Sequence, residues 1–430
     1  AALRDSFAYK RLAQLVDGFG HRMSGSPSLE RAIDWIVAEM RRDGFENVRK
    51  EPVIIPRWVR GEESAELVSP RSARLAMLGL GRSVGTPPQG ITAPVLVVGS
   101  FAELRARAAD ARGKIVFFNV PFDTTIHPGT AYGRTVVYRG AGPDSAHAVG
   151  AVAALVRSVN PFSLRSPHTG GTAASDTVRH ASRIPAAAIS LEDADMLQRM
   201  QDRGERIVVR LRMGARYMGE VQSHNVVAEI RGSEKPDEII VMGGHIDSWD
   251  VGQGAMDDAG GCVAAWEALR LIKQLGVRPK RTIRVVLWTA EEIGLIGAVA
   301  YRDQHRSEVD NHVLAMESDN GVFRPRALNI GAGPGGLEMG RSIATLLRSV
   351  GVDSAKVGGP QADISPLYAL GVPVATIDVD PWRYFWYHHS DADMIDKLNP
   401  TDLAKNAAIF AVVANVAANM EATLPRVPPR

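Results

Sequence analysis

The sequence has 430 residues, of which 45% are hydrophobic and 23% are charged, as in ordinary globular proteins. This length predicts two domains, or one large domain with an insertion. With 50 Lys and Arg residues against 48 Asp and Glu residues, the formal net charge is +2, which gives no reason to expect a nucleic acid or an anionic membrane as a partner. The single cysteine, Cys262, excludes an intrachain disulfide.

The N-terminal segment has the pattern of two helices and a strand. Apolar residues recur at helical spacing over residues 7–20 and again over 29–44, and each run ends at a glycine. Residues 48–58 then read as a strand. No apolar run reaches the roughly 20 residues that a membrane span needs. The chain begins with Ala1 rather than Met, so we expect a processed protein that is secreted or periplasmic.

The composition and the pattern of apolar residues change over residues 61–217. Short apolar stretches at 93–99 and 114–120 read as strands, and loops rich in Gly, Pro, Ser and Thr separate them, as at 160–175. This segment contains few clusters of ionisable side chains that could carry acid–base chemistry. We therefore expect a separate, mainly β, inserted domain.

An α/β pattern begins at residue 218, in which buried strands alternate with helices. The predicted strands are 238–244, 282–289, 312–318 and 372–379, and the predicted helices are 259–276, 334–351 and 401–422. This alternation predicts a mostly parallel sheet with helices on both faces. Residues 1–60 and 218–430 would then form one discontinuous domain around the insert.

Ionisable side chains gather where these four strands end. They are His245, Asp247, Asp257 and Asp258 after the first strand, Glu291 and Glu292 after the second, Glu317 and Asp319 at the third, and His388, His389, Asp391 and Asp393 after the fourth. Ligands of open α/β sheets bind at the carboxyl ends of the strands. Burying so many charges unpaired would cost several kcal/mol each, so we expect cations there.

Imidazole and carboxylate ligands without thiolate suit zinc, and also manganese or cobalt. Two ions roughly 3.5–4 Å apart would need a bridging carboxylate, which one aspartate of the Asp257-Asp258 pair can supply. In the Glu291-Glu292 pair, one carboxylate would bind metal and the other would act as general base. Asp247 is placed to fix the tautomer of His245.

Four blocks, HIDSWDVGQGAMDD, VVLWTAEEIG, MESDNG and HHSDAD, closely resemble the co-catalytic zinc exopeptidases. The resemblance covers 1–60 and 218–430, and the insert loosely resembles the protease-associated domain of that family. It implies two zinc ions and the following roles. His245 and Asp319 hold one metal, Glu292 and His389 hold the other, Asp257 bridges both, Glu291 is the general base, and Asp247 orients His245.

The resemblance also implies hydrolysis of short peptides, often dipeptides, from the free amino end, by an enzyme that is commonly a homodimer. Carboxypeptidase action and hydrolysis of an acylated amino acid are the alternatives for the same site. A further alternative is a non-catalytic binding protein that keeps the fold, but the Glu291-Glu292 pair and the ligand histidines argue against it.

A different class of protein, a nucleotide-binding oxidoreductase, is suggested by one glycine motif. Gly331, Gly333 and Gly336 satisfy G-x-G-x-x-G before a predicted helix, with Asp353 further on. The motif lies late in the predicted sheet rather than in a first βαβ unit. We therefore rank this alternative below the metal site.

Overall fold

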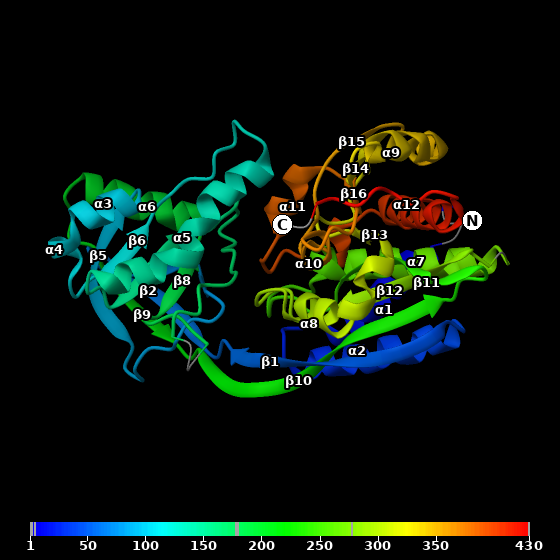
Figure 1. The fold of residues 1–430 in the computed structure, drawn as a ribbon. Coiled ribbons are helices and arrows are strands. Elements are labelled where there is room, and N and C mark those ends of the chain that lie inside the picture. The colour runs from blue at the N-terminus through cyan, green and yellow to red at the C-terminus, as the bar shows by residue number, and fades with distance from the viewer. Residues whose placement is uncertain (1–2, 4–5, 177–179, 277, 429–430) are drawn as a thin grey trace. The chain divides into compact units, whose positions relative to one another are not determined.

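The structure is a computed structural model that describes residue 3 and residues 6–176, 180–276 and 278–428 (Figure 1). The chain divides into two compact units. The first unit comprises Ala1–Ile55, Val221–Tyr384 and Asp393–Arg430, and the second comprises Pro56–Glu220 and Phe385–Ala392. The predicted domains, 1–60 with 218–430 and 61–217, stay a prediction, because compactness alone does not define a folding domain.

An eight-stranded sheet forms the centre of the first unit, in the order β1-β10-β12-β11-β13-β16-β14-β15. Its strands are β1 (Glu46–Val59), β10 (Arg216–Ile230), β11 (Lys235–His245), β12 (Arg281–Trp288), β13 (His312–Glu317), β14 (Ala327–Gly331), β15 (Ala355–Val357) and β16 (Val374–Asp378). Strands β12, β11, β13 and β16 run parallel, whereas β10 and β14 pair antiparallel with β12 and β16. The predicted mostly parallel sheet is confirmed.

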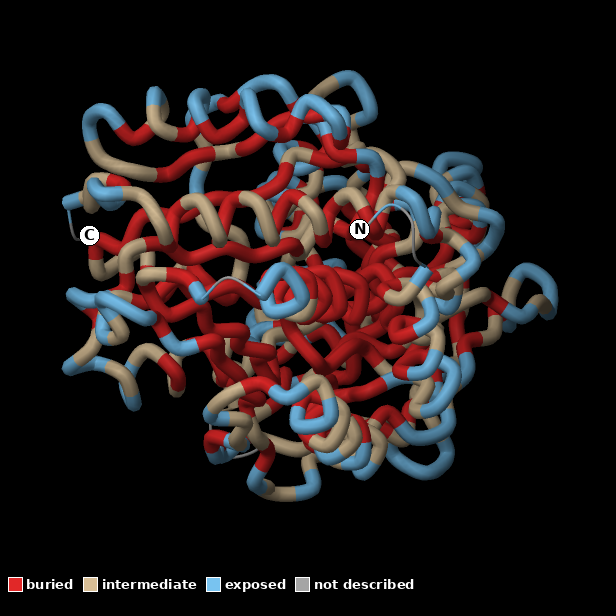
Figure 2. The backbone as a smooth tube through the Cα atoms, turned by 90° about the vertical axis from the view of Figure 1, so that its right-hand side faces the viewer, coloured by how far each residue is buried: buried red, intermediate tan, exposed pale blue. Residues whose placement is uncertain are grey.

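Helices cover both faces of this sheet (Figure 1). The helices α1 (Phe7–Phe19), α7 (Gly260–Gln274) and α12 (Pro400–Asn419) pack together on one face, and α8 (Ile296–Gln304) and α10 (Ser365–Tyr368) pack on the other. Strands enclosed in this way need continuous apolar sequence. Every residue of β12 is buried, and its apolar run Val285–Trp288 fits this rule, whereas Arg281 and Arg284 are buried charged residues; Figure 2 colours buried residues red.

Capping residues define where several helices begin. The Ser26 side chain accepts a hydrogen bond from Leu29 N at the start of α2 (Pro27–Arg42), with Pro27 at the first helical position. The Asn399 side chain caps α12 in the same way. Such caps satisfy main-chain N–H groups that the helix itself leaves unpaired. None of the helices formed by the described residues has the length and apolar character needed to cross a bilayer.

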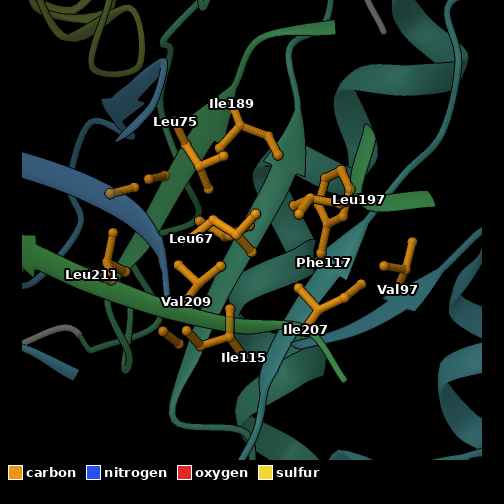
Figure 3. Packing of buried hydrophobic residues seen from close by; sticks show 14 of the residues in the cluster. Leu67, Leu75, Val97, Ile115, Phe117, Ile189, Leu197, Ile207, Val209 and Leu211 are labelled. Carbon is orange, nitrogen blue, oxygen red and sulfur yellow. The ribbon is translucent and has the colours of Figure 1, made fainter. Parts of the chain in front are cut away.

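The second unit contains its own eight-stranded sheet, in the order β3-β2-β9-β5-β6-β7-β8-β4. The strands are β2 (Glu63–Ser69), β3 (Ala73–Leu75), β4 (Met77–Gly79), β5 (Ile91–Val98), β6 (Ile115–Phe118), β7 (Ala153–Arg157), β8 (Ala186–Ile189) and β9 (Val208–Met213). Figure 3 shows its apolar packing, in which Leu67, Phe117 and Leu197 belong to one buried cluster.

The second unit also contains helices that the sequence analysis did not anticipate. They are α3 (Phe101–Ala106), α4 (Ala108–Ala111), α5 (Pro128–Ala148) and α6 (Leu191–Asp202). The longest, α5, includes Pro143 and several glycines, which lower helix propensity and conceal it in the sequence. In the first unit, the helix predicted over 334–351 divides into α9 (Gly336–Ala344) and a 3-10 turn, η3 (Thr345–Val350).

Candidate metal centre

The predicted metal ligands of the first unit lie at one edge of its sheet. His245 is the last residue of β11 and pairs in register with Trp288 of β12, which Glu291 and Glu292 follow closely. Gly243 of β11 pairs with Glu317, the last residue of β13, and Asp319 follows it. Parallel strands deliver their carboxyl ends to the same edge, so the topology itself gathers these side chains.

The imidazole of His245 is fully buried and each ring nitrogen has a defined neighbour. Nδ1 lies 2.9 Å from the main-chain oxygen of Asp247, to which it donates its proton. Nε2 lies 3.1 Å from Oδ1 of Asp257 and 3.6 Å from Oδ1 of Asp319. A proton on Nδ1 leaves the lone pair of Nε2 facing two carboxylates, which is the usual arrangement of a zinc-binding histidine.

Among the described residues of the first unit, two overlapping groups of side chains have the spacing of metal ligands. His245, Asp257 and Glu292 each offer one ligand atom within 4.8 Å of the others, and His245, Asp258 and Asp319 do the same. The structure therefore brings together four of the five predicted ligands. Imidazole nitrogen and carboxylate oxygen are donors that zinc accepts, so the residues present fit this metal.

The electrostatics of the centre also call for cations. Burial raises the pKa of Glu291 well above its ordinary value, and the charges of Asp319, Glu292 and Asp257 raise it further. Burial opposes a charge on His245, yet hydrogen bonds to Asp257 and Asp319 raise the pKa of this histidine well above its ordinary value. Divalent cations would neutralise the excess negative charge that causes these shifts.

The two adjacent aspartates have different surroundings. Asp257 faces Nε2 of His245, whereas Asp258 holds the loop: its Oδ2 accepts from His245 N at 3.2 Å and its Oδ1 accepts from Gly261 N at 3.2 Å. Asp258 has no exposed surface, and burial raises its pKa well above the ordinary value. The contact with Nε2 favours Asp257 as the bridging ligand, the role that the resemblance assigns to it.

The carboxylate of Asp247 orders the Glu291-Glu292 turn rather than the His245 ring. Its oxygens accept hydrogen bonds from Glu291 N at 3.1 Å and Glu292 N at 3.4 Å. The Ser24 hydroxyl donates to the same carboxylate at 2.6 Å. His245 Nδ1 lies 3.7 Å from the side-chain oxygen and is held instead by the main-chain oxygen of Asp247.

Asp393 holds the loop that carries Asp257. Its carboxylate accepts hydrogen bonds from Met256 N at 2.7 Å and from Asp257 N at 3.2 Å. Burial, together with the nearby Asp257 charge, raises the pKa of Asp393 to about 7. The sequence drew attention to Asp393 only as a member of an acidic block, and its pairing with a loop 136 residues away was not visible there.

Arg22 is a further residue that sequence reasoning missed. It is fully buried and donates from Nε to Ile246 O at 2.7 Å, from Nη1 to Gln253 O at 2.7 Å, and from Nη2 to Gly254 O at 2.8 Å. These carbonyl groups belong to the two loops that carry His245 and Asp257, two of the predicted metal ligands. A lone arginine in a polar N-terminal segment gives no sequence signal for this role.

His389 lies in the second unit, within Phe385–Ala392. Its ring Nδ1 is 3.3 Å from the main-chain oxygen of Thr169 and 3.5 Å from Nη1 of Arg139. Its ring also stacks on His388, with 3.5 Å between the ring centroids. The assignment of His389 as a metal ligand stays a prediction.

The glycine motif at 331–336 packs against the chain's own C-terminal tail. Gly333 N donates to Pro425 O at 2.8 Å, and a Cβ atom at Gly333 would collide with the main chain of Arg426. The strand before the motif, β14, runs antiparallel to β16. These glycines have a packing role, and the nucleotide-binding alternative loses its support.

Comparisons with known proteins agree with this fold. Residues 225–414 match the model of peptidase family M28. Carboxypeptidase Q of Homo sapiens is 48% identical over 419 residues, which are 97% of this chain and 87% of that protein. A solved structure described as a peptidase M28 precursor from Shewanella amazonensis SB2B has a TM-score of 0.95 at 37% identity, covering 100% of this chain and 97% of the other.

A zinc aminopeptidase from Bacillus subtilis shares the fold, with a TM-score of 0.71 at 22% identity over 97% of this chain and 96% of the other. The sheet, the ligand cluster and the comparisons define the class: the protein is a zinc metallo-exopeptidase. The chain belongs to peptidase family M28.

Proposed function

We propose that this zinc metallo-exopeptidase hydrolyses dipeptides and other short peptides from the free amino end. The observation that carries the proposal is the arrangement around His245, whose Nε2 faces Asp257 and Asp319 while Nδ1 is held by a main-chain oxygen. Such a ring is oriented for metal binding without any further rearrangement.

Five residues would hold the metal in this proposal: His245, Asp257, Glu292, Asp319 and, from the sequence-based assignment, His389. A pair of zinc ions would polarise the scissile carbonyl and lower the pKa of the attacking water. Manganese or cobalt is an expected substitute.

Glu291 would serve as the general base. It would take a proton from the attacking water as the water oxygen bonds to the carbonyl carbon, and would pass that proton to the departing amine nitrogen as the C–N bond breaks. Asp247 supports the step by holding the main chain of Glu291.

Carboxypeptidase action on the same site is the second candidate. The relative that is 48% identical carries the name carboxypeptidase Q, and 97% of this chain aligns with it. A dipeptide does not separate the two candidates, since cleavage from either end releases the same two amino acids.

A tripeptide with three different residues separates them. Amino-end cleavage releases the first residue and leaves the last two joined, whereas carboxyl-end cleavage releases the third residue and leaves the first two joined. Products would be identified by mass spectrometry with the zinc-loaded protein. We expect the first residue to appear first and N-acetylated tripeptide to resist cleavage; early release of the third residue would favour the carboxypeptidase candidate.

Cleavage of N-acylated amino acids in the same panel would instead point to amidohydrolase action. Treatment with a chelator should abolish activity, and added zinc should restore it. The homodimer and the secreted or periplasmic location stay predictions, and light scattering of the purified protein tests the former.

A further inference from the structure

His389 adopts a main-chain conformation that needs support from its surroundings. Its φ of +61° lies in the left-handed region, which costs a residue with a side chain about 1–2 kcal/mol. The main chain of Thr169, in the same compact unit, contacts it twice: Thr169 N donates to His389 O at 2.8 Å, and Thr169 O lies 3.3 Å from His389 Nδ1. One residue therefore holds both the backbone and the ring of His389.

Thr169 is itself firmly anchored within the second unit. Its hydroxyl donates to Gly79 O at 2.7 Å, at the end of β4, and the preceding His168 N donates to the Ser158 hydroxyl at 2.9 Å. Thr169, His168 and Ser158 are all buried. The carbonyl group that faces the His389 ring is consequently fixed by the sheet of this unit.

Arg139 of α5 supports the same carbonyl group. Its Nη1 donates to Thr169 O at 3.2 Å, and its Nη2 donates to the Tyr132 hydroxyl at 2.9 Å. Arg139 is only 8% exposed, and no carboxylate among the described residues pairs with it. Burying a guanidinium in this way is expensive, which indicates that its position serves a purpose.

The neighbours of Nδ1 also determine the tautomer of the His389 ring. A guanidinium has no lone pair and cannot accept a hydrogen bond. Thr169 O can therefore receive the Nδ1 proton, whereas Arg139 cannot, and the contact with Thr169 O is the shorter of the two at 3.3 Å against 3.5 Å. With the proton on Nδ1, the lone pair lies on Nε2, as a metal ligand requires.

The plane of the ring is restrained as well. The ring of His388 stacks on that of His389 at an interplanar angle of 22°, and the Tyr132 ring meets His388 edge-on at 5.4 Å between centroids. Gly170 leaves room for the arrangement, because a Cβ atom there would collide with the Arg139 guanidinium. Helix α5 thus supports the histidine pair through both Tyr132 and Arg139.

We propose that Thr169 O and Arg139 orient His389 so that Nε2 is its metal-binding nitrogen. This inference rests on the proposed function, in which His389 is a ligand. Arg139 is a positioning residue and not a catalytic one.

The test measures metal binding rather than activity alone. The variants are Arg139→Gln, Arg139→Lys and Tyr132→Phe, with Arg157→Gln as the matched control. Arg157 lies in the same unit and pairs with Asp195, and none of its hydrogen bonds or ion pairs involves His389. Each full-length protein would be loaded with two zinc equivalents and titrated with a competing chelator, and its cobalt-substituted form would be recorded by visible absorption.

We expect Arg139→Gln to lower the affinity for one of the two zinc ions by about 10–100-fold and to leave the affinity for the other unchanged. The cobalt bands of one site should shift, Arg139→Lys should restore part of the affinity, and Tyr132→Phe should change it in the same direction by less. Arg157→Gln should match the parent protein even if it melts at a lower temperature.

If Arg139→Gln and Tyr132→Phe both give the same chelator titration curves and cobalt spectra as the parent protein, the positioning role is wrong. The proposed function would then remain intact. The positioning role would also be wrong if Arg157→Gln lowered the affinity for both zinc ions equally, because general destabilisation would then explain the result. A parent protein that binds fewer than two equivalents would instead count against the proposed function itself.

Discussion

The main-chain oxygen of Asp247 accepts the Nδ1 proton of His245 at 2.9 Å, while the side chain of the same aspartate holds the main chain of Glu291 at 3.1 Å. One residue thereby connects the end of β11 with the turn that carries Glu291, the proposed general base. The two connections use different atoms, so a substitution of the side chain separates them.

Asp247→Ala should lower kcat by about 10–100-fold while His245 retains its metal. The alanine variant keeps the main-chain oxygen that orients the imidazole, but it removes the acceptor for Glu291 N and Glu292 N. Steady-state kinetics and zinc analysis of the same preparation check this. A full loss of metal with normal secondary structure would show that the side chain, and not the main chain, supports the ligand.

Glu291→Gln should keep both metals and lose at least about 10²-fold in rate, the lower end for a missing general base. Glu292→Gln should lower the metal content instead, since Glu292 groups with His245 and Asp257 at ligand spacing. Elemental analysis beside kinetics separates the two roles. Equal loss of metal in both variants would argue against the division of labour.

Arg22→Met should destabilise the first unit by at least about 3 kcal/mol, because hydrogen bonds from a charged donor contribute roughly 1.5–3 kcal/mol each. Arg22 donates to three carbonyl groups in the loops at Ile246 and Gln253–Gly254. Urea unfolding followed by tryptophan fluorescence measures the change. The exposed Arg31→Met serves as control and should unfold at the parental midpoint.

Stability should decrease as the pH falls from about 6.5 towards 4, with His312 as one cause. Burial is the main reason that the pKa of His312 is lowered from 6.5 to about 4. Between these values the unfolded chain binds a proton that the folded protein excludes, so acid favours unfolding, by roughly 3 kcal/mol over the full interval. The free energy of unfolding measured at several pH values gives this slope.

His312→Gln should flatten the slope by up to one proton. His312 Nε2 lies 3.0 Å from the Tyr301 hydroxyl, so the variant should also be less stable at neutral pH. If the free energy of unfolding of His312→Gln depends on pH as steeply as that of the parent protein, this histidine does not contribute to acid sensitivity.

Much of this fold could be predicted from sequence because buried parallel strands leave a local signal. The apolar runs at 238–244 and 282–289 correspond to β11 and β12, and charged residues directly after them lie at one edge of the sheet. The predicted metal binding of these His, Asp and Glu residues followed from the types of their side chains. The structure then brought His245, Asp257, Glu292 and Asp319 together.

What escaped prediction depends on contacts between distant segments. Arg22 and Ser24 reach loops more than 200 residues away, and Asp393 accepts from the Asp257 loop. No local pattern encodes such pairings. The hydrogen bond from His245 to Asp247 uses a main-chain oxygen, which any residue would supply, so the sequence pointed to the side chain instead.

A crystal of the zinc-loaded protein, with anomalous data collected on both sides of the zinc absorption edge, tests the central claim most directly. We predict two anomalous peaks roughly 3.5–4 Å apart, with Asp257 between them, His245 and Asp319 on one ion, and Glu292 and His389 on the other. A single peak, or peaks that none of these side chains contacts, would contradict a two-zinc centre built from these residues.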